Sequence, residues 1–317
     1  MRITYFSSNG RQDTINNKNL ELKTQELINK PQCKEGINQF NWPFDSLAKN
    51  DIKNELESLT GLDEVKRTVE ELEAYLIIKK QRLLYGISTD PLSLHMIFKG
   101  NPGTGKSTVA RILGKLLYAN GVLPKDSFVE VERADLVGEY IGHTAQKTRT
   151  VLNNSLGGLL FIDEAYSLGR GGEYDFGKEA IDVLVKAMED LREKFVLILA
   201  GYPKEMDWFL KLNPGLNSRF PLHIEFPDYE VNELLEIASN MAREKHYQIS
   251  ADGISYLKSL FTRLKNEGSL GESNARFVRN LLEKAYRKQA LRLVSQKYYT
   301  REKLIIINAR DLKKASY

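Results

Sequence analysis

The chain has 317 residues, 46 Lys and Arg against 42 Asp and Glu, and a formal net charge of +4; at roughly 150 residues per domain, this length predicts about two domains. Its longest apolar runs, such as Leu159–Ile162, are far shorter than the ~20 residues of a membrane-spanning helix, and the N-terminus lacks the apolar core of a secretion signal. The single cysteine, Cys33, excludes an internal disulfide and a cysteine-based metal site. The composition therefore predicts a reduced, cytoplasmic, globular protein.

Residues 1–50 are polar, rich in Asn, Gln and Lys, and show no sustained periodicity. Such a composition is typical of a small, partly ordered N-terminal arm. From Leu62 onward, the apolar residues follow one another in alternating steps of three and four. This spacing predicts one face of a helix that runs to about Tyr85 and ends at Gly86.

After this helix, short apolar runs alternate with amphipathic helical patterns. The runs that we expect to be strands are 94–98, 128–131, 158–162, 195–200 and 223–226. This alternation is typical of an α/β fold with a parallel sheet flanked by helices. Only helical patterns follow Pro227, so the sequence predicts an α/β subdomain at 51–227 and a small all-helical subdomain at 228–317.

A glycine-rich motif follows the first predicted strand, where residues 100–107 match the pattern G-x-x-x-x-G-K-[ST]. Glycines let a backbone wrap around phosphates and aim its N–H groups at them, and the helix that begins there adds a partial positive charge. Lys106 supplies a full charge near the β and γ phosphates, and the Ser107 hydroxyl can ligate Mg²⁺. A glycine turn without a nucleotide is the alternative. The residues of this segment expected to bind ATP are Asn101, Pro102, Gly103, Thr104, Gly105, Lys106, Ser107 and Thr108.

Two acidic residues, Asp163 and Glu164, follow the apolar residues of the third predicted strand. Ligands of open α/β sheets bind at the edge where the strands end. Asp163 is therefore placed to hold Mg²⁺, usually through water, and Glu164 to polarise the water that attacks the γ-phosphate. Alone, such a pair also fits a helix N-cap followed by a first-turn acid. The phosphate motif upstream favours the catalytic interpretation.

Together, these motifs resemble the AAA+ ATPase family, and the resemblance extends over residues 50–317, nearly everything outside the arm. The segment Ser58–Lys66 resembles the one that covers the adenine in that family, which implies a nucleotide contact for Leu62. The resemblance also implies the family fold, a parallel sheet flanked by helices and followed by a helical lid.

Two arginines acquire roles from the same resemblance. The segment Asn213–Phe220 is similar to the helix end that carries the arginine finger, which implies that catalytic role for Arg219. The segment Gly271–Arg276 is similar to the second sensor of the lid, which implies that Arg276 senses and binds the phosphates. The alternatives are an ordinary surface ion pair for Arg219, and for Arg276 one of several basic residues on a solvated helix.

More narrowly, three blocks resemble the CbbX-type branch of the family, namely Glu132–Thr144, Phe161–Leu168 and Asn213–Phe220. The resemblance is strongest to a sporulation ATPase of that branch, through residues 145–149 and 176–182. The sequence departs from the family at the first sensor. Many members place Asn or Thr where the fourth strand ends here in Gly201-Tyr202.

A short segment after the second predicted strand, Tyr140-Ile141-Gly142, falls where remodelling members of the family carry a pore loop. An exposed aromatic on a glycine-flanked loop can grip an extended polypeptide without reading its sequence; burial of Tyr140 under the neighbouring loop is the alternative. His143 has no second histidine or cysteine nearby, and we interpret it as a loop residue rather than a metal ligand. Residues 170–177 have the glycine content of a second pore loop or of a plain surface loop.

The resemblance implies a homo-oligomer, a ring hexamer that hydrolyses ATP with Mg²⁺, uses its arginine finger in trans and pulls or threads a protein client in sporulation. A red-type Rubisco activase is the alternative. Residues 230–317 hold 17 Lys and Arg against 10 Asp and Glu, which fits a solvated basic face or, less well, a nucleic-acid motor, because no recognition motif accompanies the charge. A nucleotide-gated scaffold without turnover has no need for Glu164.

Overall fold

The computed structural model describes residues 46–88, 93–140, 142–171, 175–192, 194–268, 274–296 and 298–316. The expected N-terminal arm lies outside these residues, except that residues 46–50 belong to helix α2 (Ser46–Glu57). The chain from Phe44 to Tyr317 forms one compact unit.

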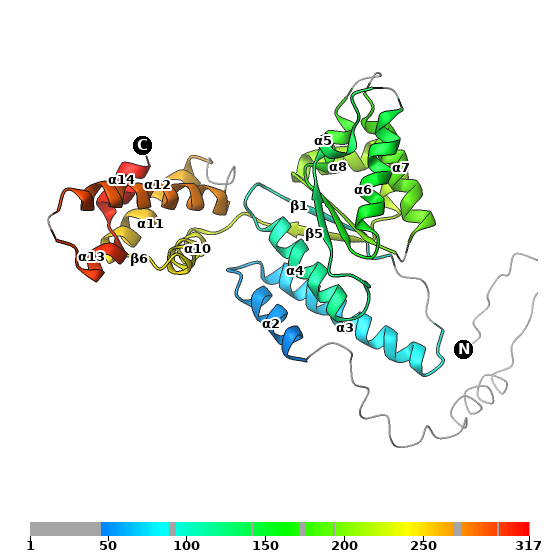
Figure 1. Cartoon of the computed structure of the whole chain (residues 1–317), viewed down its shortest axis with the longest axis horizontal. Coiled ribbons are helices and arrows are strands. Elements are labelled where there is room, and N and C mark those ends of the chain that lie inside the picture. Colours follow the sequence, from blue (N-terminus) through cyan, green and yellow to red (C-terminus); the bar gives the residue numbers. More distant parts are fainter. Residues whose placement is uncertain are drawn as a thin grey trace, which may run out of the picture. The chain divides into compact units, whose positions relative to one another are not determined.

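A five-stranded parallel sheet is the centre of the α/β subdomain (Figure 1). Its strands are β1 (Met96–Gly100), β2 (Phe128–Val131), β3 (Leu159–Ile162), β4 (Val196–Gly201) and β5 (Leu222–Phe226), in the spatial order β2-β3-β4-β1-β5. In the register of the sheet, Phe98 lies between Ala200 and Ile224. All five predicted strands are confirmed, with ends shifted by no more than two residues.

Helices cover both faces of the sheet, because successive residues of a strand point to opposite sides. Phe98 packs in one cluster with Val69 of α3 (Asp63–Leu84) and Leu113 of α4 (Lys106–Ala119). Its neighbour Ile97 packs in a second cluster with Leu184. The helices of that second face include α6 (His143–Ser155), α7 (Gly177–Asp190) and α8 (Pro203–Leu212). Burial on both faces explains why the strands are continuous apolar runs.

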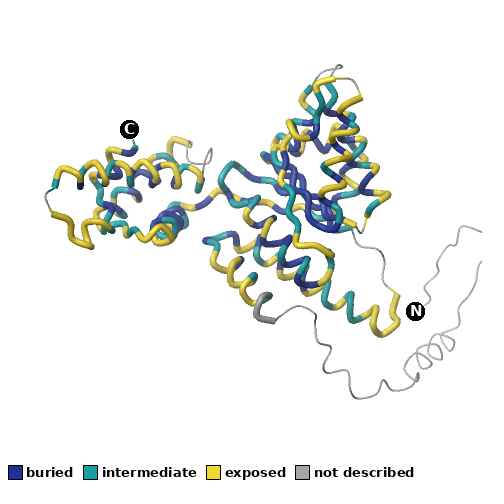
Figure 2. The backbone as a smooth tube through the Cα atoms, in the orientation of Figure 1, coloured by how far each residue is buried: buried dark blue, intermediate teal, exposed yellow. Residues whose placement is uncertain are grey.

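The long helix predicted from Leu62 is α3, and the chain turns at Gly86 with a φ of +72°. Shorter elements complete the α/β subdomain: α5 (Arg133–Leu136), the 3₁₀ helix η1 (Ala165–Gly169) and α9 (Pro214–Asn217). Figure 2 shows the buried residues concentrated along the sheet and on the inner sides of the helices. None of the described helices combines the length and the hydropathy that a bilayer crossing requires.

The lid consists of the helices α10 (Val231–Glu244), α11 (Ala251–Asn266), α12 (Asn274–Val294), α13 (Arg301–Ile305) and α14 (Ala309–Ala315). It is helical as expected, but it also contains a parallel pair of two-residue strands, β6 (Gln248–Ile249) and β7 (Ile306–Ile307). The helical patterns gave no sign of this pair, because two residues are too few to establish a period of two.

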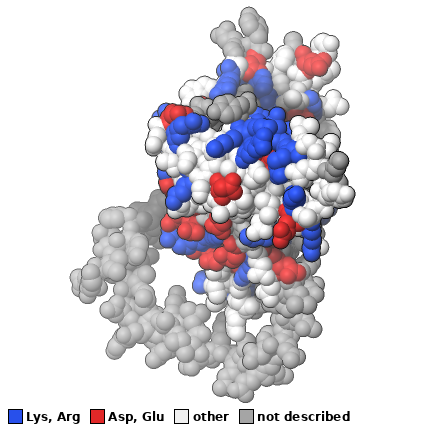
Figure 3. Space-filling model, turned by 90° about the vertical axis from the view of Figure 1, so that its left-hand side faces the viewer, with Lys and Arg blue, Asp and Glu red and all other residues white. Residues whose placement is uncertain are grey.

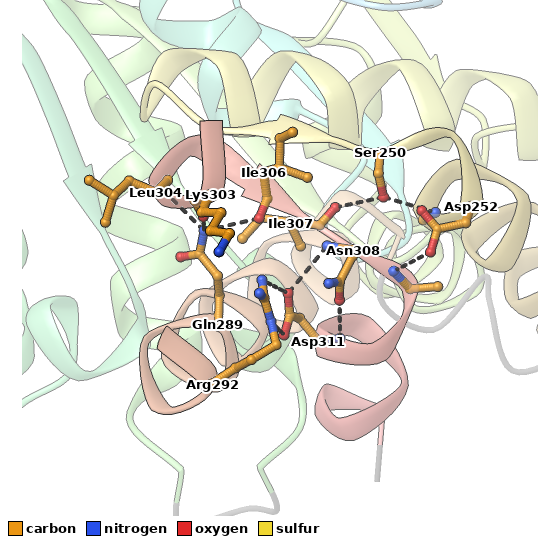
Figure 4. Close-up of polar contacts among 12 residues, drawn as sticks. Ser250, Asp252, Gln289, Arg292, Lys303, Leu304, Ile306, Ile307, Asn308 and Asp311 are labelled. Carbon is orange, nitrogen blue, oxygen red and sulfur yellow. Dashed lines mark hydrogen bonds and ion pairs between the residues drawn. The ribbon is translucent and has the colours of Figure 1, made fainter. Parts of the chain in front are cut away.

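Polar side chains fasten the end of the chain to helix α12 (Figure 4). Arg292 donates two hydrogen bonds of 2.8 Å to the carboxylate of Asp311, which is 1% exposed. Gln289 donates from Nε2 to the carbonyl oxygens of Lys303, Leu304 and Ile306 at 3.2, 3.0 and 3.0 Å. These contacts hold the return through α13 and β7 against α12.

Candidate functional site

A cavity of about 260 Å³ lies at the edge where the strands of the sheet end, and the lid contributes to its wall. It is lined by Leu59, Thr60, Leu62, Pro102, Gly103, Gly105, Lys106, Ser107, Thr108, Asp163, Glu164, Gly201, Tyr202, Tyr229, Ile237, Met241, Ala275, Arg276 and Arg279. The cavity therefore brings together the glycine-rich loop, the acidic pair and the lid arginine, which lie far apart in the sequence. Glycines, a lysine and arginines around one cavity suit a polyphosphate.

The lysine of the glycine-rich loop is tied back into that loop. Lys106 is 8% exposed, and its Nζ donates to the carbonyl oxygens of Gly100 and Asn101, both at 2.8 Å. Burial lowers the pKa of Lys106 to about 8, against the opposing effect of the Asp163 carboxylate. An anionic ligand in the cavity would favour the charged form of this side chain. Lys106 is thus a cation that a phosphate group could recruit.

The acidic pair occupies the turn between β3 and η1. Glu164 has a φ of +47°, which non-glycine residues seldom adopt, and its N–H donates to Asp163 Oδ1 at 2.9 Å. It stands at the N-cap position of η1 without a capping hydrogen bond from its side chain. The geometry therefore leaves the Glu164 carboxylate directed to other partners, and both acids line the cavity.

Tyr202, the residue at the expected first-sensor position, faces the same carboxylate. Its hydroxyl donates to Glu164 Oε1 at 3.4 Å, and its ring packs 5.5 Å from that of the buried Tyr166. Burial raises the pKa of Tyr202, and the nearby Glu164 charge raises it further. The neutral phenol is therefore a hydrogen-bond donor for the Glu164 carboxylate.

The remaining lining residues are apolar or basic. Leu59 and Leu62, which precede α3, line the cavity together with Ile237 and Met241 of α10, and such side chains suit the flat face of a base. Arg276 and Arg279 come from the first turns of α12. Several of these residues were missed by sequence reasoning, namely Tyr229, Ile237, Met241 and Arg279. The i, i+3 spacing of Arg276 and Arg279 on one helical face was a signal that could have identified the second arginine.

Two residues of the glycine-rich loop point away from the cavity. The Asn101 amide donates to both carboxylate oxygens of Asp228 at 2.9 and 3.0 Å, and the Thr104 hydroxyl donates to the Asn101 carbonyl at 2.8 Å. Neither residue is among those that line the cavity. Their side chains shape the loop, and a ligand would meet them only through the backbone.

Arg219 lies outside the cavity of its own chain. Its guanidinium forms an ion pair with Glu189 of α7 and donates to the Gly215 carbonyl. This is the ion pair that the sequence left open as the alternative. The structure therefore does not bring Arg219 together with Lys106 and Glu164 within one chain.

The Tyr140 segment is also remote from the cavity lining. Tyr140 is 66% exposed, with its ring edge-on to His143 at 5.5 Å, so the alternative of a buried tyrosine is wrong. Gly142 caps α6 with a φ of +82°, whereas Ile141 lies outside the described residues. Residues 172–174 of the expected second pore loop also lie outside the described residues, as do residues 271–273 of the expected second-sensor segment.

Ser107 and Asp163 are the side chains that could hold a divalent cation in this cavity. Both line it, and both offer the oxygen donors that Mg²⁺ prefers. In the described part of the chain, no group of three or more His, Cys, Asp or Glu side chains is arranged as a metal site. A cation here would therefore rely on water and on a phosphate ligand for its other contacts, which is usual for Mg²⁺.

Comparison with protein families gives two matches that together span most of the described chain. Residues 96–228 match the ATPase family associated with various cellular activities (AAA), and residues 230–316 match the AAA lid domain.

Curated proteins include close relatives over nearly the whole length. Stage V sporulation protein K of Bacillus subtilis (strain 168) is 50% identical over 305 residues, covering 96% of this chain and 91% of that protein. The chloroplastic ribulose bisphosphate carboxylase/oxygenase activase of Cyanidioschyzon merolae is 44% identical over 260 residues, covering 81% and 88%. Protein CbbX of Cereibacter sphaeroides is 43% identical over 252 residues, covering 79% and 81%.

Solved structures share the fold at low sequence identity. A Thermotoga maritima RuvB variant has a TM-score of 0.56 and 22% identity, covering 82% of this chain and 70% of that one. The AAA domain of FIGL-1 in complex with ADP also has a TM-score of 0.56, at 14% identity and with 82% of both chains covered. At such identities the likeness extends to the fold alone.

Proposed function

The chain belongs to the AAA ATPase family, where it is related to stage V sporulation protein K and to the CbbX-type proteins, and it is an ATPase; on that premise we propose that it forms a ring hexamer that pulls or threads a protein client. The observation that carries this proposal is the separation of Arg219 from the cavity of its own chain. A finger arginine held there can serve only the site of a neighbour. Head-to-tail contacts between neighbours close into rings.

Within each site, the roles follow from the side chains around the cavity. Lys106 would leave its carbonyl partners for the β and γ phosphates, while the loop amides cradle the phosphate oxygens. Mg²⁺ held by Ser107 and Asp163 would neutralise phosphate charge. Glu164, oriented by the Tyr202 hydroxyl at 3.4 Å, would accept the proton of the attacking water.

The lid would complete the site from the other side. Arg276 lines the same cavity as the glycine-rich loop, where it would stabilise the charge of the phosphates. Leu62 would contact the adenine. Because the nucleotide would lie between the two subdomains, hydrolysis would change the angle between them, and loops fixed to the sheet would move with it.

The proposal assigns the grip on the client to Tyr140 and its loop. The support is its 66% exposure on a turn bounded by Gly138 and Gly142. Tyr140→Ala should abolish the stimulation of ATP turnover by unfolded casein used as a probe, with the basal turnover unchanged. Tyr298→Ala, at an 83% exposed lid tyrosine, is the matched control. Stimulation that survives Tyr140→Ala would contradict the pore-loop role.

The biological setting that we propose is sporulation, in the cytoplasm. It is supported by the 50% identity to stage V sporulation protein K over 96% of the chain. The test is expression in a Bacillus subtilis strain that lacks that protein. Wild-type chain should restore spore formation and Lys106→Ala should not.

A red-type Rubisco activase is the second candidate, favoured by 44% identity to the Cyanidioschyzon merolae activase. Stimulation of turnover by ribulose bisphosphate together with inhibited Rubisco would support it over the sporulation role. A nucleic-acid motor has weaker support. Figure 3 shows Lys and Arg side chains gathered on one face of the molecule, but Asp and Glu side chains lie among them. Salt-sensitive stimulation of turnover by DNA would be needed to favour it.

Subunit mixing tests the ring directly. Glu164→Gln and Arg219→Ala should each be nearly inactive alone. Mixed in equal amounts, they should recover up to about a quarter of wild-type turnover, because a finger from one variant then meets an intact Glu164 of the other. Glu164→Gln mixed with the double variant is the matched control and should recover nothing. No recovery in the first mixture, or turnover independent of protein concentration, would contradict the trans finger.

A further inference from the structure

Three carbonyl groups of the glycine-rich loop accept hydrogen bonds from the lid and from the segment that leads into the lid. The Pro102 carbonyl accepts from Asn274 Nδ2 at 3.4 Å, and the Gly103 carbonyl accepts from the Ala275 N–H at 3.2 Å. The Thr104 carbonyl accepts from the Tyr229 hydroxyl at 3.2 Å. Three consecutive carbonyls of the loop are thus hydrogen-bonded, whereas the N–H groups of the loop take no part in these contacts.

Asn274 is the centre of these contacts. It is the first residue of α12, it is fully buried at 0% exposure, and its φ of +43° is one that asparagine tolerates better than most residues. Its Oδ1 accepts from the Tyr229 N–H at 3.0 Å, and its Nδ2 donates to Asp228 Oδ1 at 2.8 Å. Both ends of this buried amide are therefore engaged.

Asp228 extends the chain of contacts to the loop itself. It lies between β5 and α10, in the connection from the sheet to the lid. Its carboxylate accepts from Asn274 of the lid and, at 2.9 and 3.0 Å, from Asn101 of the glycine-rich loop. One carboxylate therefore joins the lid to the glycine-rich loop, outside the lining of the cavity.

We propose that Asn274 is a positioning residue that joins the glycine-rich loop to helix α12, so that occupation of the loop by phosphate and the placement of Arg276 change together. Asn274 does not line the cavity, and it acts through Pro102, through Asp228 and through the helix that it begins. Arg276 lies two residues beyond it on the same first turn. The inference rests on the proposed function only in taking this cavity as the nucleotide site.

The test uses a reciprocal exchange in the full chain. Asn274→Asp keeps the acceptor for the Tyr229 N–H but sets a carboxylate against that of Asp228, whereas Asp228→Asn removes one acceptor. Each single variant should bind a fluorescent ADP about tenfold more weakly, the effect of one broken buried hydrogen bond. The double variant Asn274→Asp/Asp228→Asn restores a donor–acceptor pair between these two side chains but not the hydrogen bond to the Pro102 carbonyl, so it should bind more tightly than Asn274→Asp and less tightly than the wild type. Asp252→Asn, an exposed lid carboxylate that accepts from the Ala309 N–H, is the matched control.

A second readout separates coupling from mere stability. Spin labels at exposed Lys211 and Arg263, in a background with Cys33→Ser, report the distance between subdomains. ATP should change this distance in the wild type and in the double variant, but not in Asn274→Asp. The kcat of Asn274→Asp should fall along with its affinity, because Arg276 is then misplaced.

Three outcomes would overturn the inference: single variants with wild-type affinity, a double variant that binds no more tightly than Asn274→Asp, or an ATP-induced change of distance in Asn274→Asp as large as in the wild type. Asp228 is exposed, so Asp228→Asn keeps the test decisive should Asn274→Asp fail to fold. Lys106→Ala distinguishes the two failures. If it abolishes ADP binding while Asp228→Asn changes nothing, the site is correct and the coupling is wrong; if Lys106→Ala still binds ADP, the assignment of the site is wrong.

Discussion

The α/β subdomain and the lid contribute to one cavity through different kinds of structure. The glycine-rich loop, Asp163 and Tyr202 follow the interior strands β1, β3 and β4, whose residues are buried almost throughout. Arg276 and Arg279 stand on exposed turns of a helix that reaches the loop through a few polar contacts at Asn274. Groups that must be fixed for chemistry come from the sheet, and groups that can move with the ligand come from the lid.

The largest expected effect tests the chemical side of this comparison. Glu164→Gln should lower ATP turnover by about 10³-fold, because a neutral amide cannot accept the proton of the attacking water. Its affinity for ATP should stay within a few-fold of the wild type, as measured by titration with a fluorescent analogue. Glu225→Gln, at an exposed position of β5, is the control. An equal loss of affinity would mean that Glu164 also holds the ligand. The contrast between a sheet that supplies the chemistry and a lid that follows the ligand would then fail.

The next prediction concerns the stability of the α/β subdomain, through a histidine that is buried beside strand β4. His95 is 1% exposed, its Nδ1 accepts from the Leu197 N–H at 3.0 Å, and burial lowers its pKa to about 4. The folded chain therefore favours the neutral ring, whereas the unfolded chain takes up a proton near pH 6.5. The free energy of unfolding should be unaffected by His95 above that pH and fall by up to about 3 kcal/mol as the pH drops from about 6.5 to about 4.

Urea unfolding of wild type and His95→Gln across this pH range measures the effect of the histidine. The glutamine retains an acceptor for Leu197 but does not titrate, so the difference between the two stabilities should shrink as the pH falls. A difference that is constant with pH would show that His95 is charged in the fold or already protonates at its ordinary pKa.

A smaller effect is expected from the lid. Arg276→Ala should lower kcat about 10- to 100-fold and raise KM by a few-fold, because the arginine stabilises charge that grows in the transition state. Steady-state kinetics of Arg276→Ala beside Arg279→Ala ranks the two arginines, and Arg263→Ala on α11 is the control. If Arg276→Ala behaves like that control, Arg276 is only part of a solvated basic face.

The smallest effect is expected at Tyr202. Removing its hydroxyl in Tyr202→Phe should lower kcat about two- to fivefold with KM nearly unchanged, since the 3.4 Å contact of this hydroxyl is with Glu164. Tyr75→Phe, at an exposed position of α3, is the control. A loss as large as that of Glu164→Gln would make Tyr202 the group that positions the attacking water.

Local patterns predicted much of the fold, because each strand is a short apolar run and each helix repeats its apolar residues every three or four positions. The five strands were placed to within two residues, and α3 was placed from the spacing of its apolar residues alone. The short β6–β7 pair was missed because it exists only through contact between residues 248–249 and 306–307. Its stability comes from the packing of the lid rather than from a local pattern.

The residues of the candidate site likewise fall into those that local patterns predicted and those that they did not. The glycine-rich loop and the acidic pair were predicted together, since the ends of parallel strands meet at one edge of a sheet. Asn274 and Asp228 carried no comparable signal. Their importance depends on three segments that are distant in sequence meeting behind the loop.

What the sequence determined by itself is the chemistry and its family: a phosphate-binding loop, two acids after a buried strand, and a helical lid. These depend on residue types at fixed short spacings, which a chain carries before it folds. Only the tertiary structure decided that Lys106 is tied to its own loop, that Arg219 pairs with Glu189 outside the cavity, and that Tyr140 is exposed. Burial, ion pairs and hydrogen bonds between distant residues are properties of the packed chain, so no local pattern contains them.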